Sequence, residues 1–250
     1  MLPADHPDLA NSLLGLAAVY NNQGRPAEAE PVLRRALAIQ GKALGADHPR
    51  IALGLRNLAA LELNLRRPAE AETFARRSLA ILEAILPAGD PSLARGLEVL
   101  AGALSDQGRG AEAEPLLRRA QEIREGTLGP AADLESRDER RRLAAILSDL
   151  GEVRRRLGEP EWAREGWERA LELVEELLAE PSDLEARAIA ATCHLRLGAV
   201  GQARPLVEEL LAAGWDDPAF LALCREHGLA GAVANGAASY PTEGGGSSRR

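Results

Sequence analysis

An internal repeat is the feature that most constrains the fold. The tetrapeptide Ala-Glu-Ala-Glu starts at positions 27, 69 and 111, and the pair Arg-Arg starts at 34, 76 and 118, which defines a 42-residue period. Asp-His-Pro starts at 5 and 47, and a degenerate third copy starts at 89. Matches at one fixed period indicate stacked supersecondary units. We therefore expect a repeat protein in which each unit packs against its neighbours.

Each unit is predicted to consist of two helices joined by a tight turn. Apolar residues recur at intervals of three and four, which is the spacing of one helix face. Gly24 suits the left-handed position that ends a helix, and Pro26 suits the first turn of the next one. In the first unit, the two predicted faces are Leu13, Leu16, Ala17 and Tyr20, and Ala29, Leu33, Ala36 and Leu37.

The composition agrees with a helical protein. Hydrophobic residues make up 46% of the chain and aromatic residues only 3%, and Ala and Leu dominate the apolar set. Ala and Leu favour helices, whereas strands are enriched in β-branched and aromatic residues. This composition argues against an all-β barrel or sandwich.

The chain divides into regular repeats, irregular repeats and a C-terminal end. Predicted turn positions are 24, 66, 108, 158 and 198. We expect three regular units in 1–126 and two irregular units in 127–214, with an insertion near 129–140. A capping helix is predicted in 215–230, because solenoids need a cover for their last repeat. Residues 231–250 are of low complexity and are predicted to be disordered.

The residues at fixed phase resemble the tetratricopeptide repeat (TPR) pattern. That pattern has Leu and a small residue in helix A, a turn Gly, and two Ala residues flanking a bulky residue in helix B. The resemblance implies an all-α fold, an α-α superhelix (TPR solenoid) of about five helix-turn-helix repeats plus a C-terminal capping helix. The period and the Leu-Gly-x-Asp-His-Pro joint resemble the kinesin-light-chain-like subclass, which is common in bacterial signalling proteins. The first unit matches at Leu16, Ala17, Tyr20, Gly24, Ala29, Leu33 and Ala36; the second unit departs from the pattern with Arg66 at its turn.

One small residue occupies the same phase in all five units, and we expect it to let helix B approach helix A closely. Interiors are close-packed, so added volume at such a position has no room. The alternative is that these residues are only good helix formers. They are Ala29, Ala71, Ala113, Ala163 and Ala203.

Charge and targeting signals narrow the class of protein. The net charge is −8, and residues 158–230 alone carry six basic and fifteen acidic residues. A nucleic-acid partner is disfavoured, because phosphate binding needs a basic face. No signal peptide or membrane span is predicted, and two cysteines do not make a disulfide framework, so we expect a cytoplasmic protein. All basic residues except Lys42 are Arg, which suggests a GC-rich, bacterial gene.

Motifs that carry chemistry are absent from the sequence. It contains no nucleophile elbow, phosphate-binding loop, dinucleotide fingerprint or His-Glu-x-x-His motif. His6 and His48 lie in the repeat joints, where Asp and Pro are expected to start the next helix. Cys224 and His227 form at most half of a metal site. We therefore expect no catalytic residue, no cofactor and no metal, and a protein that is not an enzyme.

Two clusters of arginines have two possible interpretations. Arg140-Arg141-Arg142 and Arg154-Arg155-Arg156 could form a basic patch for an acidic peptide or a phosphate. Helix faces that mix Glu and Arg more often only keep a protein soluble. The sequence leaves both interpretations open.

The resemblance implies a peptide-binding groove lined by helix A of each repeat. Asn side chains on such a surface can both donate to and accept from a peptide backbone. A solvated polar face is the alternative. The positions expected to face inward are Asn11, Leu14, Ala18, Asn21 and Asn22, then Arg56, Asn57, Ala60 and Asn64, then Arg95, Glu98 and Gly102, and then Ser148, Glu152 and Arg155.

Chaperone-tail-binding arrays are similar to this one but use a carboxylate clamp. Asn57 and Arg95 match two clamp positions. Leu14 stands where the clamp has a basic residue, and Ala18 stands where it has an Asn. Binding of a chaperone tail is therefore not expected.

Two hypotheses for function follow. The first is a non-catalytic scaffold that binds a peptide or partner protein in the groove. The second is the C-terminal regulatory part of a bacterial serine/threonine kinase or a similar signalling protein. It rests on a first joint that begins as though an upstream helix were missing, and on residues 134–230, which resemble the repeat-containing end of such kinases. A kinase domain would then have to be encoded upstream, because no kinase motif is present here.

Overall fold

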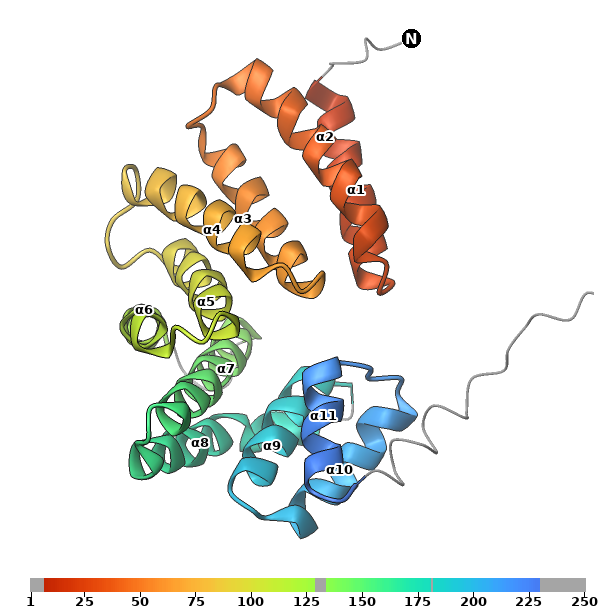
Figure 1. The fold of residues 1–250 in the computed structure, drawn as a ribbon, viewed down its shortest axis with the longest axis vertical. Coiled ribbons are helices and arrows are strands. Elements are labelled where there is room, and N and C mark those ends of the chain that lie inside the picture. Colours follow the sequence, from red (N-terminus) through yellow and green to blue (C-terminus); the bar gives the residue numbers. More distant parts are fainter. Residues whose placement is uncertain (1–6, 129–133, 181, 230–250) are drawn as a thin grey trace, which may run out of the picture. The chain divides into compact units, whose positions relative to one another are not determined.

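The computed structural model describes residues 7–128, 134–180 and 182–229, and these residues form α-helices, one 3-10 helix and no strand. This arrangement confirms the all-α prediction (Figure 1). The expected tail at 231–250 lies outside the described residues. The helices are α1 (Pro7–Asn22), α2 (Pro26–Leu44), α3 (Pro49–Asn64), α4 (Pro68–Glu83), α5 (Pro91–Asp106), α6 (Gly110–Glu125), α7 (Leu134–Arg156), α8 (Pro160–Val174), the 3-10 helix η1 (Glu175–Ala179), α9 (Leu184–Arg196), α10 (Val200–Ala212) and α11 (Pro218–Glu226).

The chain forms two compact units. Unit 1 comprises Met1–Gly129 and Glu152–Pro160, and unit 2 comprises Pro130–Gly151 and Glu161–Arg250. Within unit 1, α1 packs on α2, α3 on α4 and α5 on α6 as successive hairpins. Within unit 2, α9 packs on α10 and α11 packs on α9. No helix of the described residues combines the length and the apolar character needed to cross a membrane.

The turn inside each hairpin has one backbone geometry. Gly24 and Gly108 have positive φ angles of 68° and 75°. The N–H of the next residue, Arg25, then donates to the Tyr20 carbonyl at 2.9 Å, which is the Schellman arrangement. Arg66 replaces glycine in the second hairpin and still has φ 59°, an unfavourable value for a residue with a Cβ atom. The second repeat therefore keeps the turn at a conformational cost.

The starts of α3 and α5 correct one expectation from the sequence. At the joint before α3, the capping group is the His48 imidazole, whose Nδ1 atom accepts a hydrogen bond from the Arg50 N–H at 3.1 Å. Asp was expected to make this cap. Asp90 stands one repeat period after His48 and caps α5 by accepting from the Ser92 N–H at 2.8 Å. The capping position is thus the residue directly before Pro, and either a ring nitrogen or a carboxylate oxygen fills it.

The cores of the hairpins are built from Ala packed among Leu. Five residues at the predicted phase are buried, each with at most 1% of its surface exposed: Ala29, Ala71, Ala113, Ala163 and Ala203. Ser78 stands where the neighbouring repeats have Ala36 and Ala120, and its hydroxyl donates to the Ala52 carbonyl at 2.7 Å. This hydrogen bond satisfies a buried polar group that would otherwise destabilise the core.

Leu16 was expected on the buried face of α1, and this expectation is wrong. Its surface is 41% exposed, whereas Leu58 and Leu100, at the same phase of the next two repeats, are each 2% exposed. Leu58 packs in one cluster with Ala17 and Leu33 of the first repeat. Among the described residues α1 has no preceding repeat to cover the equivalent side chain.

Helix α7 is longer than the other first helices of the repeats. It has 23 residues, whereas α1, α3 and α5 each have 16. In unit 2 it lies very close to α8, because a Cβ atom on Gly151 would come within 2.5 Å of the Trp167 indole nitrogen. That nitrogen donates to the Ser148 carbonyl at 3.2 Å. A residue without a side chain is thus required at Gly151 for Trp167 to reach the α7 backbone.

Helix α11, the last helix that the structure describes, packs on the apolar face of the preceding hairpin. The Asp217 carboxylate caps α11 by accepting from the Phe220 N–H at 2.7 Å. Phe220 and Leu223 of α11 lie in one buried cluster with Val207 and Leu210 of α10. Such packing is what a terminal helix of a solenoid supplies.

Candidate peptide-binding groove

The first helices of the repeats in unit 1 border a pocket of about 260 Å³. Helices α1, α3 and α5 contribute the residues at its sides, and α2 contributes two residues to its floor. The lining residues are Leu14, Ala17, Ala18, Asn21, Ala29, Leu33, Asn57, Ala60, Leu61 and Arg95.

Several residues predicted from the sequence come together at this pocket. Leu14, Ala18, Asn21, Asn57 and Arg95 all line it. They come from three different helices that lie far apart in the chain. The repeat period and the helical phase alone bring them onto one surface.

Asn64 is joined to the pocket through a hydrogen bond. Its Nδ2 atom donates to the Asn21 Oδ1 atom at 3.2 Å, so these two amides link α1 and α3 at the edge of the pocket. The Asn21 amide therefore already has one partner in the fold.

Three further predicted residues are placed elsewhere. Asn11 is exposed on α1 and Arg56 is partly buried on α3, and neither lines the pocket. Asn22 ends α1, and its side chain is outside what the structure describes.

Glu98 and Arg155 are held by ion pairs. The Glu98 carboxylate accepts from Nε and Nη2 of Arg124 at 3.0 and 2.8 Å, and the Arg124 side chain is 1% exposed. Breaking a buried ion pair is costly, so Glu98 has a structural role as the partner of the buried Arg124. Arg155 binds Glu152 of its own helix at 2.8 Å. Sequence reasoning did not foresee Arg124, because a single Arg near a helix end is usually exposed.

The pocket has an apolar floor and one cationic side chain. Leu33 and Leu61 are buried beneath it, and Ala17 and Ala29 leave it room. Arg95 is exposed and is the charged residue among its lining residues. Within the described residues Arg95 forms no ion pair. The arrangement suits an apolar side chain next to a carboxylate.

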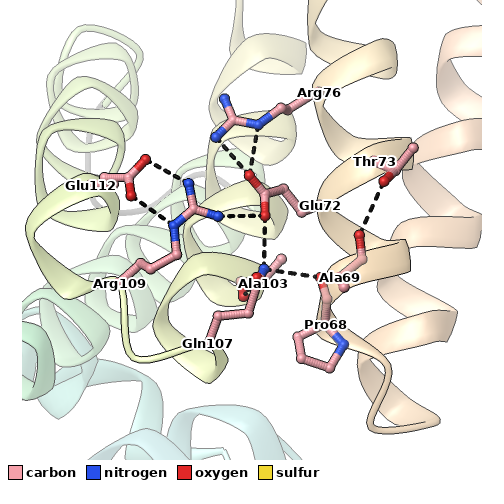
Figure 2. Close-up of polar contacts among 9 residues, drawn as sticks. All are labelled: Pro68, Ala69, Glu72, Thr73, Arg76, Ala103, Gln107, Arg109 and Glu112. Carbon is pink, nitrogen blue, oxygen red and sulfur yellow. Dashed lines mark hydrogen bonds and ion pairs between the residues drawn. The ribbon is translucent and has the colours of Figure 1, made fainter.

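The second and third repeats are joined by a cluster of polar side chains around Glu72 (Figure 2). The Glu72 carboxylate of α4 accepts from Arg109 Nη1 at 2.7 Å and from Gln107 Nε2 at 2.8 Å, both in the turn region of the third repeat. Arg76 of the same helix lies 2.7 Å away. The hydrogen bond from Gln107, together with those two guanidinium groups, holds the pKa of Glu72 below its usual range. These contacts link the third repeat to the second.

The two Arg clusters are engaged in ion pairs with neighbouring acidic groups. In unit 2, Arg140 lies 3.4 Å from Glu176, and Arg141 lies 3.1 Å from Asp183. In unit 1, Arg154 lies 3.3 Å from Glu114. These contacts favour the structural interpretation of the clusters over a basic patch for ligands.

Buried cysteines account for part of the unit 2 core. Burial raises the pKa of the Cys193 thiol to about 12 and that of Cys224 to about 11. A thiol is nucleophilic only as a thiolate, so both are poor nucleophiles near neutral pH. In the described part of the chain no three His, Cys, Asp or Glu residues gather in a way that could hold a metal ion.

Comparisons with known proteins give one consistent result. Three family models, each described as tetratricopeptide repeat, match residues 8–84, 93–133 and 148–218. No curated protein matches the sequence. The structure is similar to a putative kinesin light chain with nearly identical TPR-like repeats from Podosopora anserina, with 24% identity, a TM-score of 0.58, and coverage of 83% of this chain and 95% of that one.

Two other solved structures are also similar. BtubC (BKLC) from P. vanneervenii has 21% identity and a TM-score of 0.61, with coverage of 70% of this chain and 67% of that one. A Rap protein complexed with Competence and Sporulation Factor has 16% identity and a TM-score of 0.66, with coverage of 90% of this chain and 61% of that one. At these identities the likeness shows the fold. None of these three solved structures supports the resemblance of residues 134–230 to the end of a protein kinase.

Proposed function

Because the chain belongs to the tetratricopeptide repeat family, we propose that it is a non-catalytic interaction module that binds an extended segment of a partner protein in the groove of unit 1. The observation that carries the proposal is the pocket formed by Leu14, Ala18, Asn21, Asn57 and Arg95. A signalling or scaffolding role in a bacterial cytoplasm is the setting that we propose for it.

The chemistry of the pocket defines the class of ligand. An apolar side chain of the partner would fill the space above Leu33 and Leu61, where it removes apolar surface from water. A neighbouring Asp, Glu or C-terminal carboxylate would pair with the Arg95 guanidinium. The Asn57 amide, at the border of the same pocket, offers a donor and an acceptor to the peptide backbone.

The experiment that tests this proposal is selection of a random-peptide phage library on the purified chain. We expect enriched peptides to contain an apolar residue next to an acidic one. Ala18→Leu fills the pocket from an exposed position and should weaken binding of the enriched peptides about tenfold without unfolding the chain. Ala38→Leu is the matched control, because Ala38 is exposed on α2 and does not line the pocket.

Charge is tested separately. Arg95→Gln should weaken the binding of acidic peptides and leave the affinity for their neutral analogues unchanged. Arg35→Gln, at an exposed Arg outside the pocket, should change neither affinity. The combined Asn21→Ala and Asn64→Ala variant should also weaken binding. Equal affinity of all variants, or no enrichment at all, would reject the groove as the binding site.

A further inference from the structure

A second pocket lies wholly within unit 2. It has a volume of about 310 Å³ and is bordered by α7, α9 and the start of α11. Trp215 and Phe220 are its aromatic lining residues, and the small residues Ala145 and Ala188 line it from α7 and α9. The pocket is distinct from the groove proposed above, because no residue lines both.

The two pockets use the same register of the repeat. Ser148 stands ten residues before the turn Gly158, as Leu14 does before Gly24, and Asp149 stands nine residues before it. Leu14 lines the first pocket, and Ser148 and Asp149 line the second. Helix A of the fourth repeat therefore shares one lining position with the first repeat, Ser148 with Leu14, and one with the second, Asp149 with Asn57.

The charges of the two pockets have opposite signs. Asp149 from α7 and Asp217 at the start of α11 line the second pocket, and the hydroxyl groups of Ser148 and Thr192 add polar atoms. No Lys, Arg or His is among its lining residues. Asp149 and Asp217 both keep interactions within the fold, since Asp217 caps α11 and Asp149 has a further contact.

From this geometry we propose that the unit 2 pocket is a second binding site, which takes an Arg or Lys side chain of a partner protein. A guanidinium or ammonium group is attracted to an indole ring, and the half-buried Trp215 lines the pocket together with the two Asp residues. Residues 158–230 carry six basic and fifteen acidic residues, so the surroundings also attract a cationic segment. The site does not depend on the groove of unit 1.

The test follows the Trp215 indole N–H signal by NMR on the full chain. The probe is the tripeptide acetyl-Ala-Arg-Ala-amide, and acetyl-Ala-citrulline-Ala-amide is its neutral isostere. The chain has three Trp residues, and Trp215→Phe assigns the signal. We expect a saturable shift with the Arg peptide, weaker binding at higher salt, and no saturable shift with the citrulline peptide.

Two variants locate the binding. Asp217→Ser removes the carboxylate but keeps a side chain that can cap α11, and Asp149→Asn removes the other charge. Each should weaken binding of the Arg peptide about threefold. Asp216 is an exposed acidic residue that does not line the pocket, so Asp216→Ser should leave this affinity unchanged. Equal shifts by both peptides, no saturation in the parent chain, or equal affinity in all three variants would overturn the proposal.

This test separates the two sites. The unit 1 variants Ala18→Leu and Arg95→Gln should leave the Trp215 titration unchanged. Loss of phage-selected peptide binding in those variants, with an intact Trp215 response, would show two independent sites. A Trp215 response that disappears in the unit 1 variants would contradict the assignment to unit 2.

Discussion

The Arg109 Nη1 atom lies 2.7 Å from the Glu72 Oε2 atom, and this contact joins the turn of the third repeat to helix α4 of the second. The same relationship occurs one repeat earlier, where Arg67 Nη1 lies 2.9 Å from Glu30 Oε2. The second Glu of the recurring Ala-Glu-Ala-Glu motif is therefore an inter-repeat contact. Where the fourth repeat has Glu159 at the turn, Arg154 supplies the contact to Glu114.

Replacing Glu72 by Gln should change how stability depends on pH. The pKa of Glu72 is lowered in the fold, so its contribution is present above the ordinary carboxyl pKa and is lost as pH falls through the lowered value. Urea unfolding from pH 7 to pH 3 should therefore show the parent chain losing its advantage over Glu72→Gln in acid. Glu70→Gln, exposed on the same helix, is the control and should follow the parent chain. A constant difference across this range would contradict the assignment.

Overpacking of the helix A–helix B contact should destabilise the third repeat. Ala113 is fully buried at the shared small-residue position. We expect Ala113→Leu to lower the free energy of unfolding by about 1–3 kcal/mol, because the close-packed core has no space for the larger side chain. Ala111→Leu lies on the exposed side of α6 and should have little effect. Equal melting temperatures of the two variants would show that the alanines are only helix formers.

The turn of the second repeat should be improved by glycine. Arg66 has φ 59°, whereas Gly108 has φ 75° at the same phase of the next repeat. Removing the Cβ penalty by Arg66→Gly should raise the free energy of unfolding by about 1 kcal/mol, measured by urea denaturation. Gly108→Ala introduces the same penalty and should lower it by a similar amount. If Arg66→Gly destabilised the chain, its side chain would have to make a contact that outweighs the backbone strain.

Much of the fold followed from periodicity. Fixed spacing located the hairpins and the turn residues, and helical phase placed Leu14, Asn57 and Arg95 on one surface. Such predictions succeed because each depends on local geometry repeated along the chain.

Contacts between repeats were beyond what a single sequence shows. The partner of Glu98 is Arg124, and the choice depends on which side chain the neighbouring helix buries. Leu16 has the phase of a core residue and still lies exposed, since burial depends on a neighbouring element. The His48 cap was missed because Asp47 beside it is the commoner capping type.

Two leucines at one repeat phase should respond differently to truncation. Leu58 is 2% exposed and packs between repeats, so Leu58→Ala should cost about 2–5 kcal/mol. Leu16 is 41% exposed, and Leu16→Ala should cost less than about 1 kcal/mol. Thermal and urea unfolding of the two variants measure the difference. Equal losses would mean that the Leu16 face is covered in solution.

The buried thiol of Cys193 should weaken the fold in alkaline solution. Burial raises its pKa to about 12, above its ordinary value of 9.0. A raised pKa gives stability that is complete below the ordinary pKa and is lost as pH rises toward 12, because the unfolded chain ionises first. Between pH 8 and pH 10.5, the parent chain should therefore lose about 1–2 kcal/mol more than Cys193→Ala does, as measured by urea unfolding. The native thiol should also react slowly with a disulfide reagent at pH 8. Parallel pH profiles of the two chains, or rapid native labelling of Cys193, would show that the thiol is accessible to water.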